Sequence, residues 1–369
     1  MNKLIKHGFS ILLLMVLLCT LLIPGFAYPA PSYGAQDTMA KTERMDPLSF
    51  AHRSAWRMAP ENSLPAVYHA ITMGVDGVEV DVMLSKDGIL TLMHDSTIDR
   101  NVVGHTGKVA DYTWSQLRSM ALRPEQGGTG STKYTMSAAQ AKVLNTLPNY
   151  SAHYGKAASS GATVNVARFD DCMDMIAIYG PKTVVTIDKC SNETVFSACY
   201  KLLREKNMLG NAYFKCAKLA SDMTAWFPVA VKDWNTAHPE EPITVDDVKN
   251  SILFLQVMGN PNQSILQDHL NNGNYLKAVE ITYGEDTAAA REKLITNGFA
   301  DFCHANGIAL YGATIFAGGW SGGRPDSEKT WAYMLNMGFD GIQTDRPAEL
   351  VSYLYDYNRH RGSDEVIQV

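Results

Sequence analysis

Residues 49–100 read SFAHRSAWRMAPENSLPAVYHAITMGVDGVEVDVMLSKDGILTLMHDSTIDR, and the order of strand and turn signals within them decides the fold. The segment 77–84 (GVEVDVML) alternates side chains with the period of two that predicts a β-strand. Glu79 and Asp81 therefore project from one face, about 7 Å apart along the strand, and the valines predict burial of the other face. Two such carboxylates stay ionised only beside a cation or paired basic groups. An oxygen-rich site of this kind suits Mg²⁺ or Ca²⁺ better than Zn²⁺.

Two histidines bracket this strand. His52 and Arg53 follow the short run 48–51, and His94 ends the segment 88–93, which pairs back on the strand as a hairpin. Two imidazoles beside a divalent cation and a guanidinium form a workable phosphodiester site. One imidazole would deprotonate a nucleophile and the other would protonate the leaving oxygen.

Several short motifs occur in one order along the chain. They are His52-Arg53, Pro60-Glu61-Asn62-Ser63, Gly77-x-Glu79-x-Asp81-Val82, Lys86-Asp87-Gly88, His94-Asp95, Asp99-Arg100 and the late segment 338–347 (GFDGIQTDRP). In this order and spacing they resemble the glycerophosphodiester phosphodiesterase family. The close match covers residues 51–113 and 338–350, and between them only the strand–helix rhythm matches.

The resemblance implies hydrolysis of glycerophosphodiesters to glycerol 3-phosphate and an alcohol, with one divalent cation, Ca²⁺ or Mg²⁺. In the mechanism we favour, His52 is the base and His94 the acid in the first step, or the reverse, and Arg53 neutralises phosphate charge. Related barrels act on sphingomyelin, lysophospholipids or phosphoinositides. A lipid phosphodiesterase resembling sphingomyelinase D is therefore the main alternative.

Strands and helices alternate along the rest of the chain. Further strands are predicted at 183–188, 212–216, 252–258, 276–283, 308–315 and 340–344, and helices at 169–179, 193–206 and 348–361. Near eight strands in this alternation favour a single-domain (β/α)₈ barrel over residues 46–361, the fold that the resemblance also implies. An open doubly wound sheet is the second choice, but no Gly-rich fingerprint follows the first strand. Residues 123–165 are interpreted as an insertion or long loop.

Asp188 ends a predicted strand, and we expect it to be the third metal ligand. The family usually has Glu at this strand end and Lys two residues later. Here Asp188 is a shorter acid and Lys189 comes one position early, which leaves the role of this lysine in phosphate binding open.

Two other positions complete the candidate site. Glu280 on a later strand would face the pocket and meet a polar or cationic head group, and Trp320 would supply an aromatic wall for the alcohol or anchor its loop. Asn62 is expected to cap the helix that follows it, with Ser63 as the other candidate. Glu61 is expected to bond Arg53 or the loop, so both Asn62 and Glu61 are interpreted as architectural.

The N-terminal sequence predicts the cellular location of the protein. Lys3 and Lys6 precede the apolar run 9–23, which is shorter than the roughly 20 residues that span a bilayer. Residues 1–27 are therefore interpreted as a cleavable signal peptide of a secreted protein, with an uncleaved anchor as the alternative. A linker (28–45) and a C-terminal tail (362–369) flank the barrel.

Charge and cysteine content limit the partners. Removing residues 1–27 takes away two lysines and no acidic residue, so the net charge changes from −6 to −8. This argues against nucleic acid as a partner, and the expected partner is a small-molecule substrate. Five cysteines would remain, and an odd number cannot all pair within one chain.

Two different functions compete with this interpretation. Residues 319–323 (GWSGG) fit a nucleophile elbow, with Ser321, then Asp340 or Asp345, then His360 in the order of an α/β-hydrolase. However, Gly and Pro follow the serine where that elbow needs a helix to begin. The other rival is an inactive, lipid-binding barrel, which only the altered Asp188-Lys189 pair supports.

Overall fold

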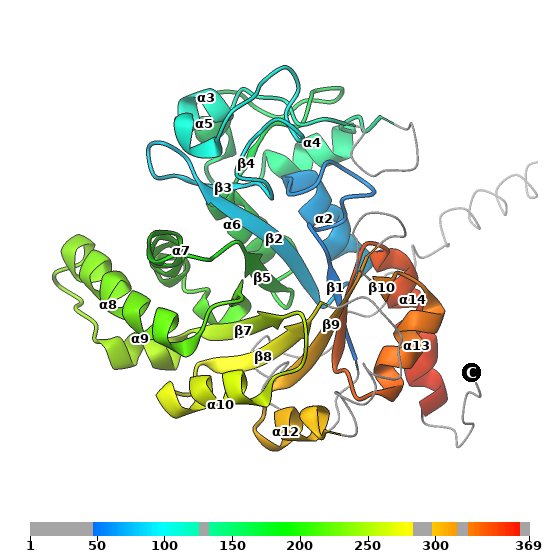
Figure 1. The fold of residues 1–369 in the computed structure, drawn as a ribbon. Coiled ribbons are helices and arrows are strands. Elements are labelled where there is room, and N and C mark those ends of the chain that lie inside the picture. Colours follow the sequence, from blue (N-terminus) through cyan, green and yellow to red (C-terminus); the bar gives the residue numbers. More distant parts are fainter. Residues whose placement is uncertain (1–46, 125–132, 283–296, 316–323, 362–369) are drawn as a thin grey trace, which may run out of the picture.

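Eight parallel strands close into a barrel in the computed structural model, which describes residues 47–124, 133–282, 297–315 and 324–361 (Figure 1). The ring closes because its first strand pairs with both the second and the last. In order around the ring, the strands are β1 (Leu48–Ala51), β2 (Gly77–Leu84), β5 (Val184–Asp188), β6 (Ala212–Cys216), β7 (Leu253–Met258), β8 (Leu276–Ile281), β9 (Ala309–Ile315) and β11 (Gly341–Thr344). The predicted (β/α)₈ barrel is confirmed, and the open doubly wound sheet is excluded.

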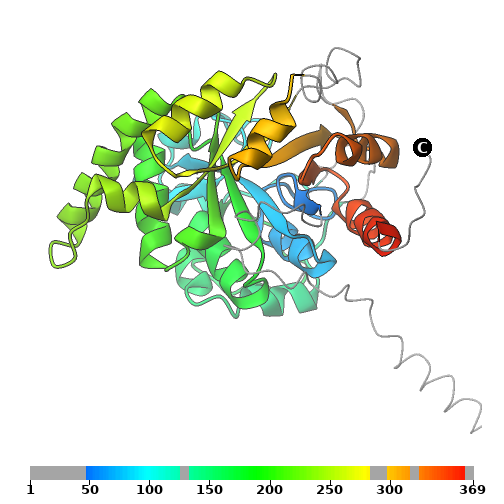
Figure 2. The ribbon, with the colours of Figure 1, turned by 90° about the horizontal axis from the view of Figure 1, so that it is seen from below.

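Helices cover the outside of the barrel (Figures 1 and 2). They are α2 (Leu64–Met73), α6 (Phe169–Tyr179), α7 (Glu193–Glu205), α8 (Ala220–Ala237), α9 (Val245–Ser251), α10 (Gln263–Asn272), α12 (Phe299–Ala305), α13 (Glu328–Asn336) and α14 (Pro347–Arg361). Ser63 caps α2, because its hydroxyl accepts a hydrogen bond from the backbone N–H of Ala66. The expectation that Asn62 is the cap is therefore wrong.

A small antiparallel extension lies beside the barrel. β3 (Leu90–Leu92) pairs antiparallel with β2, which confirms the predicted hairpin, and β4 (Ala167–Arg168) pairs with β3. Short elements complete the fold: η1 (Val109–Asp111), α3 (Trp114–Leu117), η2 (Leu209–Asn211) and β10 (Arg324–Pro325).

The interpretation of residues 123–165 as a long loop is partly wrong. Two helices, α4 (Ala138–Leu144) and α5 (Tyr150–Tyr154), form within this segment, and they bury Leu144 and Tyr154. Helices of one or two turns are too short to show a clear hydrophobic period in a sequence.

The barrel interior has an apolar floor and a polar upper part. Phe50, Tyr213, Leu255 and Tyr311 belong to the cluster that fills the floor. Side chains alternate along a strand, so the residue two positions after each floor residue also points into the interior. It lies nearer the C-terminal end of the barrel. On several strands these next side chains are polar and buried, among them Glu79, Thr186, Lys215, Glu280 and Gln343. Barrel enzymes place their active sites at this C-terminal end.

Gly312 on β9 is required by close packing outside the barrel. A Cβ atom there would lie 1.9 Å from Cε of Met334 and 2.8 Å from Cε1 of Phe339. We expect Gly312→Ala to lower the free energy of unfolding by about 1–3 kcal/mol, measured by urea denaturation. Gly259→Ala is the control, because its Cβ would meet nothing within 4 Å. Equal stability of the two variants would contradict the packing argument.

Several predictions fall outside the described residues: the signal peptide (1–27), the linker (28–45), the tail (362–369), Trp320 and Ser321. Among the helices that the structure describes, none combines the length and the apolar character needed to cross a membrane.

Candidate active site

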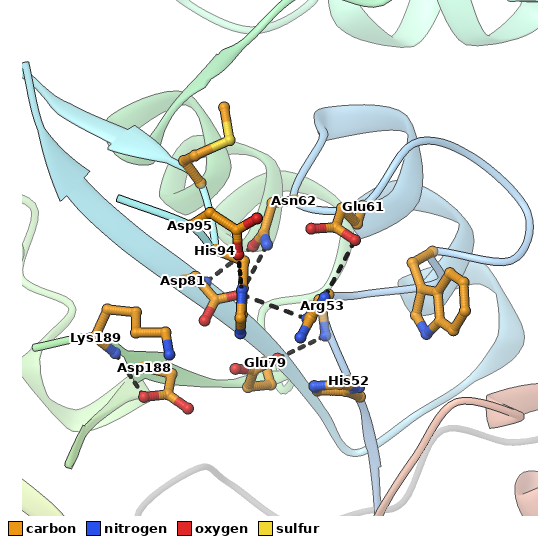
Figure 3. A network of polar contacts seen from close by, with 12 residues as sticks. His52, Arg53, Glu61, Asn62, Glu79, Asp81, His94, Asp95, Asp188 and Lys189 are labelled. Atoms are coloured by element: carbon orange, nitrogen blue, oxygen red, sulfur yellow. Dashed lines mark hydrogen bonds and ion pairs between the residues drawn. The ribbon is translucent and has the colours of Figure 1, made fainter. Parts of the chain in front are cut away.

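Three carboxylates meet at the C-terminal end of the barrel. Glu79 and Asp81 project inward from β2, and the β2–β5 register places Asp188 opposite Asp81. Glu79 and Asp81 are each 1% exposed, and one oxygen of each of the three carboxylates lies within 4.8 Å of the others. Figure 3 shows this group on two neighbouring strands, with His52 and His94 beside it. The structure thus brings together residues that the sequence separates by more than 100 positions.

The electrostatics of this group fit a bound cation. Oδ1 of Asp81 is buried and has no hydrogen-bond partner among the described residues. Burial, together with the charge of Asp81, raises the pKa of Glu79 to about 7. A divalent cation would give Oδ1 of Asp81 a partner and would favour the ionised form of Glu79. Three carboxylates are the hard oxygen donors that Mg²⁺ and Ca²⁺ prefer.

The loop between β1 and α2 holds the two acids of β2 in place. The side-chain amide of Asn62 donates to Oδ2 of Asp81 over 2.8 Å, and its Oδ1 accepts from the backbone N–H of Asp81 over 2.9 Å. The backbone N–H of Arg53 donates to Oε2 of Glu79 over 2.6 Å. Asn62 and Arg53 both have positive φ, 54° and 47°, so the loop backbone turns sharply back onto the strand. Asn62 is thus a site residue. The sequence did not indicate this role, because Asn directly before a helix is typical of a helix cap.

His52 is backed by a buried carboxylate from the other end of the chain. Its Nδ1 lies 2.6 Å from Oδ1 of Asp345, and Trp56 Nε1 donates to the same oxygen over 2.6 Å. Burial lowers the pKa of His52, but the hydrogen bond and charge of Asp345 outweigh this effect, so the net pKa is raised. Asp345 lies in the segment 338–347 that carries the family resemblance, but a chemical role for it was expected only under the serine-hydrolase alternative.

His94 is backed by its neighbour in sequence. Its Nδ1 lies 2.6 Å from Oδ1 of Asp95, and Arg100 Nε donates to the other oxygen of Asp95 over 2.7 Å. Burial lowers the pKa of His94, and Asp81 and Asp95 only partly offset that effect. The hydrogen bonds from Arg100 and His94 overcome burial and lower the pKa of Asp95 to about 2. Asp95 is therefore a permanent anion at neutral pH.

Two arginines share the buried Glu61. Arg100 makes a bidentate pair with it, at 2.9 and 2.7 Å, and Arg53 Nη1 lies 3.3 Å from Oε2. The expected bond from Glu61 to Arg53 is confirmed. Arg53 Nε is also 4.0 Å from Oδ2 of Asp81, so the guanidinium lies beside the cluster of three carboxylates. A forked donor at this place suits a phosphate group.

The backbone accommodates the position of Lys189 directly after Asp188. Lys189 has a φ of 63°, and its N–H donates to Oδ1 of Asp188 over 2.6 Å. Burial raises the pKa of Asp188, but the charge of Lys215 and this backbone hydrogen bond outweigh burial, so the net pKa is lowered. The carboxylate of Asp188 is therefore held as an anion before any metal binds.

Glu280 forms an ion pair with a lysine of the same chain. Nζ of Lys215, a lysine on β6 that sequence reasoning did not single out, lies 3.0 Å from Oε1 of Glu280. Both side chains are almost fully buried in the barrel interior. Contact of Glu280 with a substrate head group stays a prediction.

We expect Asp345→Asn to show which step His52 serves. Removing this charge lowers the pKa of His52, whereas the amide oxygen can still accept its Nδ1–H. If His52 is the base, the acidic limb of the pH profile of kcat/KM moves to lower pH. If it is the acid, the alkaline limb moves down instead. Turnover at the optimum should fall roughly 10–100-fold, and unmoved limbs would exclude His52 from proton transfer.

The acids of the serine-hydrolase alternative have other partners. Asp345 is bound to His52, and Oδ2 of Asp340 lies 3.0 Å from His304 Nε2. Neither contact involves the histidine that this alternative requires.

Comparison with known proteins identifies related sequences. The model of the "Glycerophosphoryl diester phosphodiesterase family" matches residues 52–349. Glycerophosphodiester phosphodiesterase 1 of Bos taurus is 39% identical over 127 residues, which cover 30% of this chain and 38% of that protein. The glycerophosphodiester phosphodiesterase of Caldanaerobacter subterraneus subsp. tengcongensis is 41% identical over 76 residues, covering 21% and 31%. The matched segments thus span less than two fifths of these relatives.

Solved structures share the fold. A glycerophosphoryl diester phosphodiesterase from Parabacteroides distasonis superposes with a TM-score of 0.57 at 16% identity, covering 88% of this chain and 93% of the other. An Oleispira antarctica phosphodiesterase, solved in complex with the product sn-glycerol-3-phosphate, has a TM-score of 0.53 at 17% identity, covering 84% and 97%. At these identities the likeness establishes the barrel alone.

Proposed function

Because the chain belongs to the glycerophosphoryl diester phosphodiesterase family, we propose that it hydrolyses glycerophosphodiesters to glycerol 3-phosphate and an alcohol. We further propose that one divalent cation, Mg²⁺ or Ca²⁺, binds at Glu79, Asp81 and Asp188. The observation that carries the proposal is the cluster of these three carboxylates within 4.8 Å of one another, flanked by two carboxylate-backed histidines. The names of the curated relatives and the product bound to the Oleispira antarctica neighbour support the same substrate class.

The chain's own residues then divide the proton transfers. In the order that we favour from the sequence, His52 accepts the proton of a glycerol hydroxyl adjacent to the phosphate, and that oxygen attacks phosphorus. The bond from phosphorus to the alcohol oxygen breaks, and His94 donates its proton to the departing oxygen. Water opens the resulting cyclic phosphate, with His94 as base and His52 as acid, which restores both rings. The cation, when bound, supplies positive charge that holds the phosphate and acidifies the attacking hydroxyl. In the metal-free protein the raised pKa of His52 and the lowered pKa of His94 favour the reverse order, and the pH profile of Asp345→Asn distinguishes the two.

The carboxylates behind the histidines prepare both rings for these steps. Asp345 and Asp95 each accept from an Nδ1–H, which leaves Nε2 as the atom that exchanges a proton with the substrate. Arg53, next to Asp81, offsets the negative charge that develops on phosphate in the transition state.

The leaving group and the cellular location are further proposals. We favour a water-soluble glycerophosphodiester over an intact lipid, because the names of the family and of the relatives specify glycerophosphodiesters. We also propose that the predicted signal peptide directs secretion of the protein. N-terminal sequencing of the protein from culture medium tests it, and an intact residue 1 on cell-bound protein would reject it.

Turnover of defined substrates tests the proposed function. The full chain should release glycerol 3-phosphate from glycerophosphocholine or glycerophosphoethanolamine, lose this activity in a chelator, and regain it with Mg²⁺ or Ca²⁺. Sphingomyelin and lysophosphatidylcholine are included as the lipid alternatives. Activity on these alone would favour the lipid phosphodiesterase, and no metal-dependent turnover of any diester would favour the inactive barrel. Ser321→Ala should retain activity, because the serine-hydrolase alternative alone requires that hydroxyl.

A further inference from the structure

A lysine lies inside the barrel in contact with one of the three carboxylates. Lys215 is 2% exposed, and its Nζ is 3.0 Å from Oε1 of Glu280, 2.9 Å from Oε1 of Gln343 and 3.5 Å from Oδ2 of Asp188. An ammonium group has three N–H donors, and these three oxygens are enough to engage all of them. The charge therefore has a defined position beside Asp188.

The two oxygens of Asp188 are held differently. Oδ1 accepts from the backbone N–H of Lys189, which no substitution of a side chain removes. Oδ2 faces the ammonium of Lys215, so a cation that bound this oxygen would lie close to a positive charge. Removal of Lys215 thus leaves one anchor of the carboxylate intact and removes the competing charge.

Glu280 controls how strongly that competing charge acts. It is 3% exposed and forms the shortest ion pair of Lys215. Charges in a buried site are poorly screened, so the carboxylate of Glu280 offsets much of the field of the ammonium at Asp188. The pair is nearly neutral as a unit, whereas either member alone would carry a full charge next to the cation site.

We propose that Lys215 and Glu280 are positioning residues that set the cation affinity of the site, Lys215 by competing for Asp188 and Glu280 by offsetting Lys215. The proposal rests on the cation site of the proposed function and deepens it. Such a pair keeps Asp188 oriented in the metal-free protein without closing the site to a cation.

Opposite changes in affinity are expected from the two members of the pair. Lys215→Met keeps the aliphatic stem and removes the charge, so Mg²⁺ and Ca²⁺ should bind roughly tenfold tighter or more. Glu280→Gln leaves the ammonium unbalanced, so both cations should bind roughly tenfold weaker or more. The double variant should bind within a few-fold of the wild type, because it removes one charge of each sign.

Calorimetric titration of Mg²⁺ and of Ca²⁺ into the chelator-stripped full chain measures these affinities. Thermal melting with and without cation gives a second readout. The rise in melting temperature on adding cation should be larger than in the wild type for Lys215→Met and smaller for Glu280→Gln. Lys206→Met is the matched control, since Lys206 pairs with Asp174 on the outer helices, and its cation affinity should not change.

The outcomes separate this inference from the proposed function. A wild type that binds neither cation overturns both the inference and the cation site. A wild type that binds while Glu280→Gln changes the affinity less than twofold overturns the inference alone. Shifts of both single variants in one direction also overturn it, because a purely structural pair would weaken binding in each case. If Lys215→Met does not fold, Lys215→Gln takes its place, because only opposite shifts in the Lys215 and Glu280 variants support the inference.

Discussion

His94→Ala is expected to lower turnover of glycerophosphocholine roughly 10²–10⁴-fold, the usual contribution of a general acid. Choline leaves as a poorly stabilised alkoxide unless a proton reaches its oxygen. The p-nitrophenyl diester of glycerol 3-phosphate releases a stabilised phenolate that needs no proton. On this substrate His94→Ala should therefore lose far less activity in the step that releases p-nitrophenolate.

His52→Ala should lose activity on both substrates, since deprotonation of the attacking hydroxyl is required whatever group leaves. Single-turnover release of p-nitrophenolate measures the first step apart from opening of the cyclic phosphate. The reverse pattern, with His52→Ala rescued by the better leaving group, would exchange the two roles. Wild-type rates for both variants would refute catalysis by this histidine pair.

Glu79→Gln is expected to have opposite effects on activity and on metal-free stability. Turnover should fall roughly 10²–10³-fold or more, because a neutral amide is a poor ligand and the charge that holds the phosphate is lost. In chelator, however, the variant should melt at a higher temperature than the wild type, since it removes the repulsion between Glu79 and Asp81. The oxygen of the new amide can still accept from the N–H of Arg53.

The pH dependence of this stabilisation has a definite sign. Burial raises the pKa of Glu79 from its ordinary value of 4.5 to about 7, so the folded protein binds a proton that the unfolded chain has released. The wild type therefore loses stability as pH rises from about 4.5 through about 7, and the loss persists above that value. The gain in melting temperature from Glu79→Gln should be larger at pH 8 than at pH 5. Glu240→Gln, an exposed control, should show no gain, and a gain independent of pH would contradict the argument.

Local pattern was sufficient to predict the barrel and the acids of β2. The period of two in residues 77–84 determined that Glu79 and Asp81 share one face, because backbone geometry alone sets that relation. Strand boundaries predicted at 183–188 and 212–216 differ from β5 and β6 by at most one residue. Alternation of strands and helices then left few folds other than a closed parallel barrel.

Contacts between distant segments were decided only by tertiary structure. Asp345 reaches His52, 293 residues away, because closure of the barrel pairs β11 with β1 and brings their C-terminal ends together. Lys215 meets Gln343 across the barrel interior, 128 residues away. Single residues on separate strands carry no local signal of such a meeting, since register and closure arise from packing of the whole ring. The sequence alone thus determined which strands carry the acids and histidines, and the closed barrel determined which charges surround them.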